Sequence, residues 1–528
     1  MSAEQAAGTL GTGSRPVGAR EGQGSAVMSR LRSVPRAAWL CALVALANGL
    51  AWSLIVPPFE VPDENAHYAY VAHVAETGSP PRPASPEGPL PPRQEDLMSA
   101  LLAFGMVGNR ENPAPLTDFQ QKTIEAVEAQ HLSATGPGDA LSATNNPPAY
   151  YYLQAAVYRL MPSGRVLDKL AAMRCLSALM GAITVLLVFM FLRDLLPARP
   201  WAWTAGALLV AFQPLFGFIS AGVNNDNLLY LAAAGTLWGV ARCFRRGLTP
   251  ANGALLGGFL GLGLVSKLTM LGFVPAVLLA LALLLIRDLR GDRRAPPGVR
   301  GAAVGDRRGA LGGAATALSL SLGPVVVYLL LNHFAWHRGF IPGGVGGFST
   351  PVANPRHFNF SEEVSHVWQL FLPRLWLRPQ FSSYPLWQTW FVGFVGRFGW
   401  QDYTFPYWFY DVARILTVAV LALAAVELVT RRAAVRRRLG ELAVYVAAVL
   451  GLCVEIGIQS YRYLVANGQI FEQARYLLPL LGLYGAIGAL AVRAGGRRWG
   501  PTLAAGLVIL AIGHDLYAQA ITIARYYS

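Results

Sequence analysis

The segment that begins at Asp63 brings two carboxylates and an imidazole together within five residues. If the chain turns helical after Pro62, Asp63 and His67 stand at i and i+4, and Glu64 and His67 stand at i and i+3. The three polar groups would then share one face of the helix. A carboxylate placed this way can act as a general base that removes the proton of an acceptor hydroxyl. We therefore expect Asp63 and Glu64 to be catalytic and His67 to contact the substrate.

Two other interpretations of this segment stay open. Asp63 could be the N-cap of a helix that ends at Gly78, which would leave Glu64 and His67 without a reason. Two carboxylates and a histidine are also suitable ligands for a divalent metal, so a bound metal stays open and no cofactor is certain. The spacing alone does not decide which carboxylate is the base.

Two basic residues are candidates for binding a phosphate group. Arg475 lies in the segment 472–479, where a polar loop enters an apolar stretch, and a guanidinium can hold a phosphate bidentately. An arginine at a helix end can also simply extend its head group to water. Lys267, in a short turn between two apolar segments, is a second candidate, because polar residues at membrane depth are often functional.

Two further segments combine aromatic rings with polar groups. The segment 145–152 either anchors a helix at the bilayer interface or covers a groove that faces lipid. The segment 397–406 suits sugar stacking, although an interfacial belt of aromatic rings explains it equally well. From these segments we expect substrate contacts by Asn146, Tyr150, Arg397, Trp400 and Asp402.

The elements that position these residues are expected to be membrane-spanning helices. Of the 528 residues, 54% are hydrophobic and only 14% are charged, whereas about 25% are charged in an ordinary soluble domain. A spanning helix needs about 20 mostly apolar residues. Eleven segments are predicted to span the membrane: 37–56, 171–192, 201–220, 228–243, 251–265, 271–286, 311–332, 409–429, 442–459, 476–492 and 501–520.

The formal net charge of +14 comes largely from short arginine-rich connections between these segments. They lie at 242–246, 287–308, 431–438 and 493–498, and the positive-inside rule assigns them to the cytoplasm. Alternation from a cytoplasmic N-terminus then puts five connections outside: 57–170, 221–227, the short turn 266–270 that carries Lys267, 334–408 and 461–475. No aromatic-and-basic module accompanies the charge, so we expect no nucleic-acid partner.

The predicted organisation has four parts. Residues 1–36 form a disordered cytoplasmic tail, and 37–333 form the membrane core with a first extracytoplasmic loop at 57–170. Residues 334–408 form a second large extracytoplasmic loop, and 409–528 form the C-terminal transmembrane helices. The four cysteines have no paired spacing, and no nucleotide-binding motif is present.

An ordered set of motifs along the chain resembles the bacterial membrane proteins known as DUF2142. The layout is more broadly similar to the GT-C superfamily of polyprenyl-phosphate-dependent glycosyltransferases, which implies a GT-C-like arrangement of helices. The set consists of Pro57-Pro58-Phe59, Pro62-Asp63-Glu64 with His67, Asn146-Pro147-Pro148 with the tyrosines at 150–152, Asn224 with Asp226, Phe398-Gly399-Trp400 with Asp402 and Pro406, and Arg475-Tyr476-Leu477-Leu478-Pro479.

The resemblance implies an inverting transfer of a sugar from a polyprenyl-phosphate donor to an extracytoplasmic glycan, lipid or protein. Asp63 would be the base, with Glu64 as its neighbour or substitute. Arg475, assisted by Lys267 or Arg397, would contact the lipid phosphate. The set also implies substrate contacts by Asn224, Asp226 and Tyr476. The location implied is a bacterial cytoplasmic membrane, crossed many times, with the active site on the outer side.

This mechanism requires Asp63 and Arg475 to lie within about 20 Å of one another, because a held sugar phosphate cannot bridge more. The main alternative is a transporter or flippase of lipid-linked sugars, which needs a polar path through the bilayer. Glu455 is the acidic residue that such a path would use. A scaffolding subunit without chemistry is a third option.

Overall fold

The computed structural model describes nine stretches of the chain. They are residues 34–81, 118–129, 143–196, 199–290, 307–338, 358–378, 380–382, 385–468 and 472–527. The predicted tail at 1–36 lies almost entirely outside these residues. Most of these residues are helical, and the strands among them are one pair of two residues each.

Eight helices in the described residues are long and apolar enough to cross a membrane. The chain is therefore an all-α integral membrane protein, as its composition predicts. The eight are α2 (Arg36–Ile55), α7 (Val166–Leu195), η2 with α12 (Leu268–Phe273 and Val274–Leu289), α13 with η3 (Arg307–Leu330 and Leu331–Ala335), α16 (Tyr407–Thr430), α18 (Leu439–Asn467), η4 with α19 (Ala474–Leu480 and Leu481–Ala494) and α20 (Gly500–Tyr527).

The predicted count of eleven spans is not confirmed, although each predicted segment overlaps a helix. Helices α8 (Pro200–Ala211) and α9 (Pro214–Ser220) are bent by 60° and together make at most a ninth span. Helix α11 (Pro250–Leu264) is apolar but short. Helix α10 (Asp226–Arg246) begins with an acidic residue and ends with two arginines, so its apolar stretch is shortened at both ends.

The polar connections carry shorter elements. Between α2 and α7 lie α3 (Glu64–Thr77), α5 (Asp118–Ala129) and α6 (Ala149–Leu160). Between α13 and α16 lie α14 (Phe360–Phe371), α15 (Leu386–Gly396) and an antiparallel hairpin of β1 (Arg397–Phe398) and β2 (Tyr403–Thr404), while α17 (Arg432–Arg436) precedes α18. Gly78 follows α3 in the left-handed conformation, with φ 76°, which confirms the predicted end of this helix.

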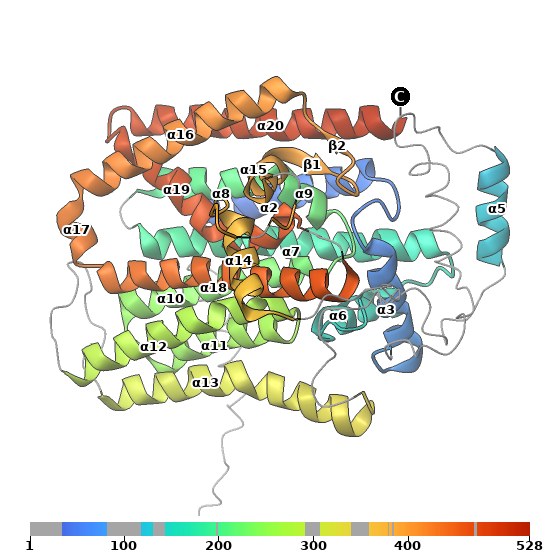
Figure 1. The fold of residues 1–528 in the computed structure, drawn as a ribbon, viewed down its shortest axis with the longest axis horizontal. Coiled ribbons are helices and arrows are strands. Elements are labelled where there is room, and N and C mark those ends of the chain that lie inside the picture. Colours follow the sequence, from blue (N-terminus) through green and yellow to red (C-terminus); the bar gives the residue numbers. More distant parts are fainter. Residues whose placement is uncertain are drawn as a thin grey trace, which may run out of the picture.

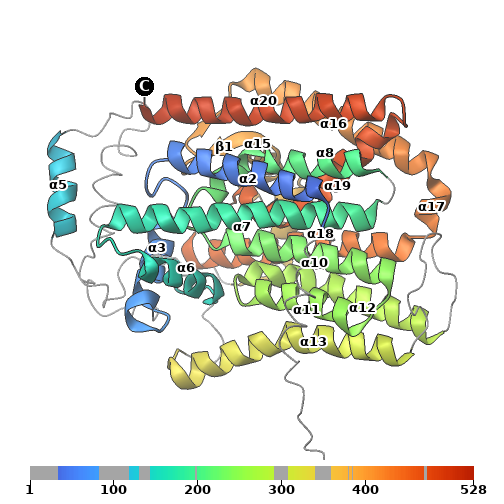
Figure 2. The same cartoon turned by 180° about the vertical axis from the view of Figure 1, so that it is seen from behind.

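The long helices lie side by side, with α16 and α20 along one edge of the molecule and α13 along the other (Figure 1). Helix α7 runs through the middle and packs against α2, α8 and α10 (Figure 2). At about 1.5 Å per residue its 30 residues extend for about 45 Å. Its two ends therefore mark the two ends of the helical bundle.

Two of the arginine-rich connections lie at one end of α7. Asp194 near its C-terminus forms ion pairs with Arg242 and Arg246 of α10, at 3.8 and 3.6 Å. Arg438, just before α18, donates to the carbonyl of Leu195. Two of the connections that the charge pattern assigned to one side of the membrane therefore meet at the same end of the bundle.

Helices α11 and α13 touch through their backbones. Three glycines of α11 recur every fourth residue, so they share one face of that helix. A Cβ on any of them would overlap a carbonyl oxygen of α13. The glycines are Gly253, Gly257 and Gly261, and the oxygens belong to Gly313, Ala317 and Leu320.

This close contact predicts that even a methyl group on the α11 face would destabilise the protein. Gly257→Ala should lower the free energy of unfolding by about 1–3 kcal/mol, because the added methyl group forces the two helices apart. Gly258→Ala is the matched control, since nothing lies within 4 Å of a Cβ at that position. Unfolding in detergent micelles would measure both variants. Equal stability of the two would contradict the close contact.

Candidate functional site

Asp63 and Arg475 form an ion pair at the end of the bundle opposite to Asp194 and its arginine partners. Arg475 Nη2 donates to Asp63 Oδ2 at 2.5 Å, and Arg475 Nη1 donates to the carbonyl of Pro62 at 3.2 Å. The two side chains that the mechanism requires within about 20 Å are thus in direct contact. Asp63 occupies the N-cap position of α3 but makes no capping hydrogen bond with its side chain. Capping therefore does not explain this carboxylate.

The surroundings of Asp63 favour the ionised form of its carboxyl group. The Asp63 side chain is 31% exposed, whereas that of Arg475 is 5% exposed. Burial is the largest influence and raises the pKa of Asp63, but the charges of the neighbouring basic groups, Arg475 foremost, together with the hydrogen bond from Arg475 outweigh it and hold this pKa below its usual range. Asp63 is consequently ionised at neutral pH and can accept a proton.

A second carboxylate stands behind the pair. Asp226, fully buried at the start of α10, accepts from Lys267 Nζ at 2.6 Å through Oδ1. Its Oδ2 lies 3.8 Å from Arg475 Nε. Asp63, Arg475, Asp226 and Lys267 therefore form one chain of alternating charges, to which we refer as the charge chain.

Two more predicted residues flank the charge chain. Asn224 donates to the carbonyl of Pro62 at 3.0 Å and accepts from the main-chain N–H of Asp226 at 2.9 Å. The ring of Tyr476 has the Arg475 guanidinium 5.3 Å from its centroid and the Lys267 ammonium 5.5 Å from it. Both distances permit a cation–π attraction.

His67 contacts an aromatic neighbour. Its Nδ1 is 2.9 Å from the hydroxyl of Tyr151, and the two rings are stacked. Burial lowers the pKa of His67 to about 4, which the negative charge of Asp63 only partly offsets. The imidazole is neutral at physiological pH and joins α3 to α6.

Glu64 does not have the environment expected of a catalytic base. It is fully buried, and Arg174 of α7 holds both of its oxygens, with donor distances of 2.8 and 2.6 Å. The main-chain N–H groups of Phe59 and Val223 also donate to this carboxylate. An oxygen that already accepts two hydrogen bonds has no room for an acceptor hydroxyl. The geometry therefore argues against the expectation that Glu64 is catalytic.

Arg174 was not singled out from the sequence. A lone arginine in the predicted span 171–192 was the available signal, because a charge within an apolar helix requires a partner. Its partner lies 110 residues earlier in the chain. A pattern of neighbouring residues cannot indicate a pairing across so long a stretch of the chain.

Tyr150 and Asn146 lie on the α6 side of the loop and do not join the charge chain. The Tyr150 hydroxyl is 3.2 Å from Ser177 Oγ of α7 and accepts from Gln154. The carbonyl of Asn146 accepts from Tyr70 of α3. These contacts pack α6 between α3 and α7.

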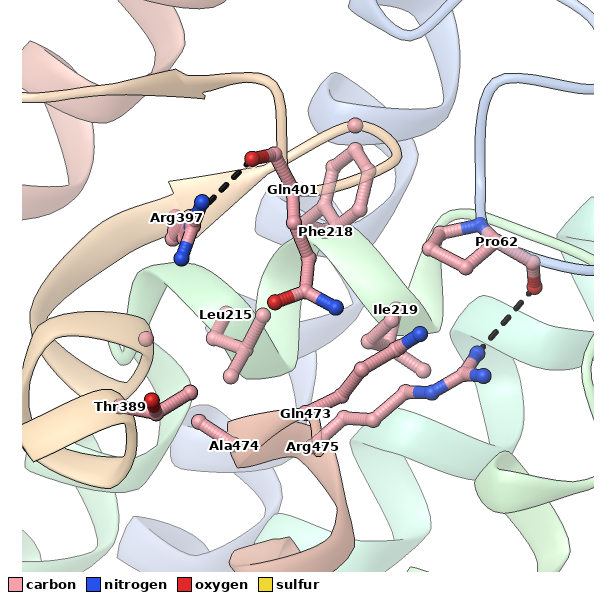
Figure 3. A pocket seen from close by; sticks show the side chains of 12 residues that line it. Pro62, Leu215, Phe218, Ile219, Thr389, Arg397, Gln401, Gln473, Ala474 and Arg475 are labelled. Carbon is pink, nitrogen blue, oxygen red and sulfur yellow. Dashed lines mark hydrogen bonds between the residues drawn. The ribbon is translucent and has the colours of Figure 1, made fainter. Parts of the chain in front are cut away.

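The predicted residues of the hairpin separate into two groups. Asp402 is buried against Arg525 of α20, with 3.1 Å between Oδ2 and Nη2. Trp400 is 38% exposed. Arg397 donates to the carbonyl of Gln401 and turns toward the same pocket as Arg475 (Figure 3). Only Arg397 of the three is brought near the ion pair.

A pocket opens between Arg397 and Arg475 (Figure 3). It holds about 340 Å³ of space, counting its open side. Helix α9 supplies apolar side chains, α15 supplies Thr389, and the amides of Gln401 and Gln473 project into it. Its lining contains two arginines and no acidic side chain. This lining suits a ligand in which an anionic group is attached to an apolar or a hydroxylated group.

The metal interpretation finds no ligand set in the part of the chain that the structure describes. There, no three histidine, cysteine or acidic side chains lie close enough to hold a metal ion. Asp63, Glu64 and Asp226 each face a basic side chain. A cation at this site would have to displace one of those side chains.

Fold and site together define a multi-span membrane protein with a charged cluster at one end of its helices. Residues 46–484 match the family described as "Predicted membrane protein (DUF2142)". The chain belongs to this family, which confirms the resemblance seen in its motifs. No curated protein matches the chain.

Two similar solved structures are both of the oligosaccharyltransferase from Archaeoglobus fulgidus. The structure tethered to an acceptor peptide is 12% identical, with a TM-score of 0.41 and coverage of 92% of this chain and 55% of that one. The apo form gives 12% identity, a TM-score of 0.42, and coverage of 93% and 56%. This chain spans about half the length of those proteins.

The ion pair predicts a pH-dependent stability. Because the folded-state pKa of Asp63 is depressed, the pair stabilises the protein fully above about pH 4, the ordinary value of an aspartate. That stabilisation is lost as the pH falls through the depressed value. Asp63→Asn should therefore cost about 3 kcal/mol at neutral pH, because it leaves Arg475 buried without its partner, and the cost should shrink in acid.

Melting temperatures in detergent, measured across this pH range, would test the expectation. Asp411→Asn is the control, since Asp411 pairs with Arg414 while 69% exposed, and exposed pairs contribute about 0–1 kcal/mol. A difference between wild type and Asp63→Asn that stays constant in acid would contradict the depressed pKa.

Proposed function

We propose that the protein is a membrane glycosyltransferase that moves a sugar from a polyprenyl-phosphate donor to an extracytoplasmic acceptor. The observation that carries the proposal is the contact between Asp63 and Arg475 beside a pocket lined by two arginines. One side chain can accept a proton while the other binds a phosphate. These are the two groups that displacement of a lipid phosphate by a hydroxyl requires.

In the proposed reaction Asp63 takes the proton of the acceptor hydroxyl. The freed oxygen attacks the anomeric carbon, and the bond from that carbon to the phosphate oxygen breaks. Its electron pair leaves with the lipid phosphate, where Arg475 stabilises the developing charge. Attack from the face opposite to the phosphate inverts the anomeric configuration. The depressed pKa of Asp63 keeps its carboxylate ionised, so it is free to accept a proton when the acceptor arrives.

The contacts favour Arg397 over Lys267 as the second phosphate ligand. Arg397 and Arg475 line the same pocket. Lys267 is absent from the pocket lining and pairs with Asp226, so its charge acts mainly on the neighbouring carboxylate. Asp226 in turn lies 3.8 Å from Arg475 Nε and limits where that guanidinium can move.

The side of the membrane is part of the proposal. The charge chain lies at the end of α7 remote from Asp194 and its arginine partners. Under the positive-inside rule this remote end is extracytoplasmic. The loops 57–170 and 334–408 would then supply Asp63 and Arg397 to an active site on the outer surface.

Transfer from a polyprenyl-phosphate sugar to a hydroxyl acceptor is the direct test. We expect purified protein in membranes to release the lipid phosphate and glycosylate the acceptor. Asp63→Asn should lower kcat by about 10²–10⁴-fold, the usual contribution of a general base. Asp411→Asn, an exposed carboxylate in α16, should keep wild-type activity. Full activity in Asp63→Asn would exclude Asp63 as the base.

A second assay separates the enzyme from a transporter of lipid-linked sugars. Glu455, the acidic residue that a transport path would use, accepts from Gln459 of its own helix at 2.5 Å. In sealed vesicles, we expect transfer without movement of the donor across the bilayer. Movement of intact donor without transfer would reject the proposed function.

A further inference from the structure

We propose that Arg174 and Glu64 are positioning residues that hold the Asp63 carboxylate in place for sugar transfer. The inference rests on the proposed function, since it concerns the base of that reaction. Neither residue lines the pocket, and both are almost completely buried. They act on the site through the backbone that carries Asp63.

Arg174 uses its guanidinium to bind two separate parts of the chain. Its Nε and Nη2 grip the two oxygens of Glu64 at 2.8 and 2.6 Å. Its Nη1 donates to the carbonyls of Ser53 and Val56, and its Nη2 donates to that of Pro57 at 2.8 Å. One side chain of α7 thus fixes the end of α2 and the start of α3.

Glu64 joins two further segments to the same point. The main-chain N–H of Phe59 donates to its Oε2 at 2.8 Å, and that of Val223 donates to its Oε1 at 2.9 Å. Val223 belongs to the turn that carries Asn224, which itself donates to the carbonyl of Pro62. The residue before Asp63 and the residue after it are therefore both held.

The backbone between these anchors is strained. Phe59 and Asp63 have φ values of 65° and 64°, in the left-handed region, which aspartate enters more readily than most residues but a bulky residue such as phenylalanine rarely adopts. Such conformations persist only when the surroundings enforce them. Glu64 binds the N–H of Phe59 directly and follows Asp63 in the chain. The conformation that aims Asp63 at Arg475 therefore depends on the pair Arg174–Glu64.

Glu64→Gln and Arg174→Lys would loosen this pair in different ways. The first removes the negative charge at nearly constant shape, and the second keeps the positive charge but loses the planar fork. Arg174→Lys is the milder variant if Glu64→Gln does not fold. Glu441→Gln is the matched control, because Glu441 is held by Arg438 through two contacts of 2.7 Å, well away from the site.

The first readout is independent of activity. Asp63 is 31% exposed, so a carbodiimide reagent can reach it, and peptide mass spectrometry gives the pH at which half of it is labelled. If the pair holds Asp63 against Arg475, loosening it weakens their contact and raises the pKa of Asp63 toward the ordinary value. We expect the labelling midpoint to move upward in both variants and to stay unchanged in Glu441→Gln.

The second readout is kinetic. In Glu64→Gln we expect kcat to fall about 100-fold, because a displacement of about 1 Å has that effect on a reacting group. The KM for the donor should change little, and the acid limb of the pH profile should move upward with the labelling midpoint. The double variant should lose less than the two single variants combined, since both substitutions break the contact between Arg174 and Glu64, while only Arg174→Lys also disturbs the bonds to the carbonyls of Val56 and Pro57.

The outcomes separate the inference from the function on which it rests. A folded Glu64→Gln or Arg174→Lys with the wild-type labelling midpoint overturns the positioning role, even if its melting temperature is lower. A midpoint that also moves in Glu441→Gln overturns it as well. Wild-type protein that transfers no sugar overturns the proposed function, while the labelling experiment still decides the positioning role.

Discussion

Charge neutralisation at the end of an apolar helical bundle is the constraint on which this structure depends. Buried ions are costly unless each finds an opposite charge at close range. The charge chain meets that requirement with residues from four parts of the sequence, Asp63, Asp226, Lys267 and Arg475. Because each carboxylate faces a basic side chain, no segment can leave the cluster without exposing a charge of its neighbour. The same ion pairs therefore form the candidate site and hold the ends of the helices together.

The second polar loop and the C-terminal helix close the same end of the bundle. Asp402 of the hairpin pairs with Arg525 of α20, and Tyr526 of α20 donates to Glu60 at 3.0 Å. Burial raises the pKa of Glu60 to about 7, although the hydrogen bond from Tyr526 opposes this. Helix α20 thus binds both the hairpin and the segment that precedes Asp63. It contributes no side chain to the pocket lining.

The sequence predicts the positions of the helices and several residues that the structure brings together in the candidate site, for reasons that are local or topological. Apolar length fixed the approximate position of the spans, and the alternation of loops placed Asp63, Asp226 and Arg475 at one end. It could not recognise the true partner of Glu64, because spacing describes neighbours within a helix and Arg174 is 110 residues away. The count of eleven spans is not confirmed, because α10 has charged residues at both ends and α11 is short. The contact of Asp402 with Arg525 depends on how distant segments pack, so the spacing of residues in the hairpin does not indicate it.

The charge chain also has a simple electrical property. Together with Arg397 it contains three basic and two acidic side chains, while His67 is neutral. A phosphodiester with one negative charge would therefore complete a neutral assembly. If a proton then passes to Asp63, the site gains one positive charge as the phosphate becomes a monoester with about two negative charges. The assembly would be neutral before and after transfer, so a poorly solvated site need not admit a counterion during the reaction.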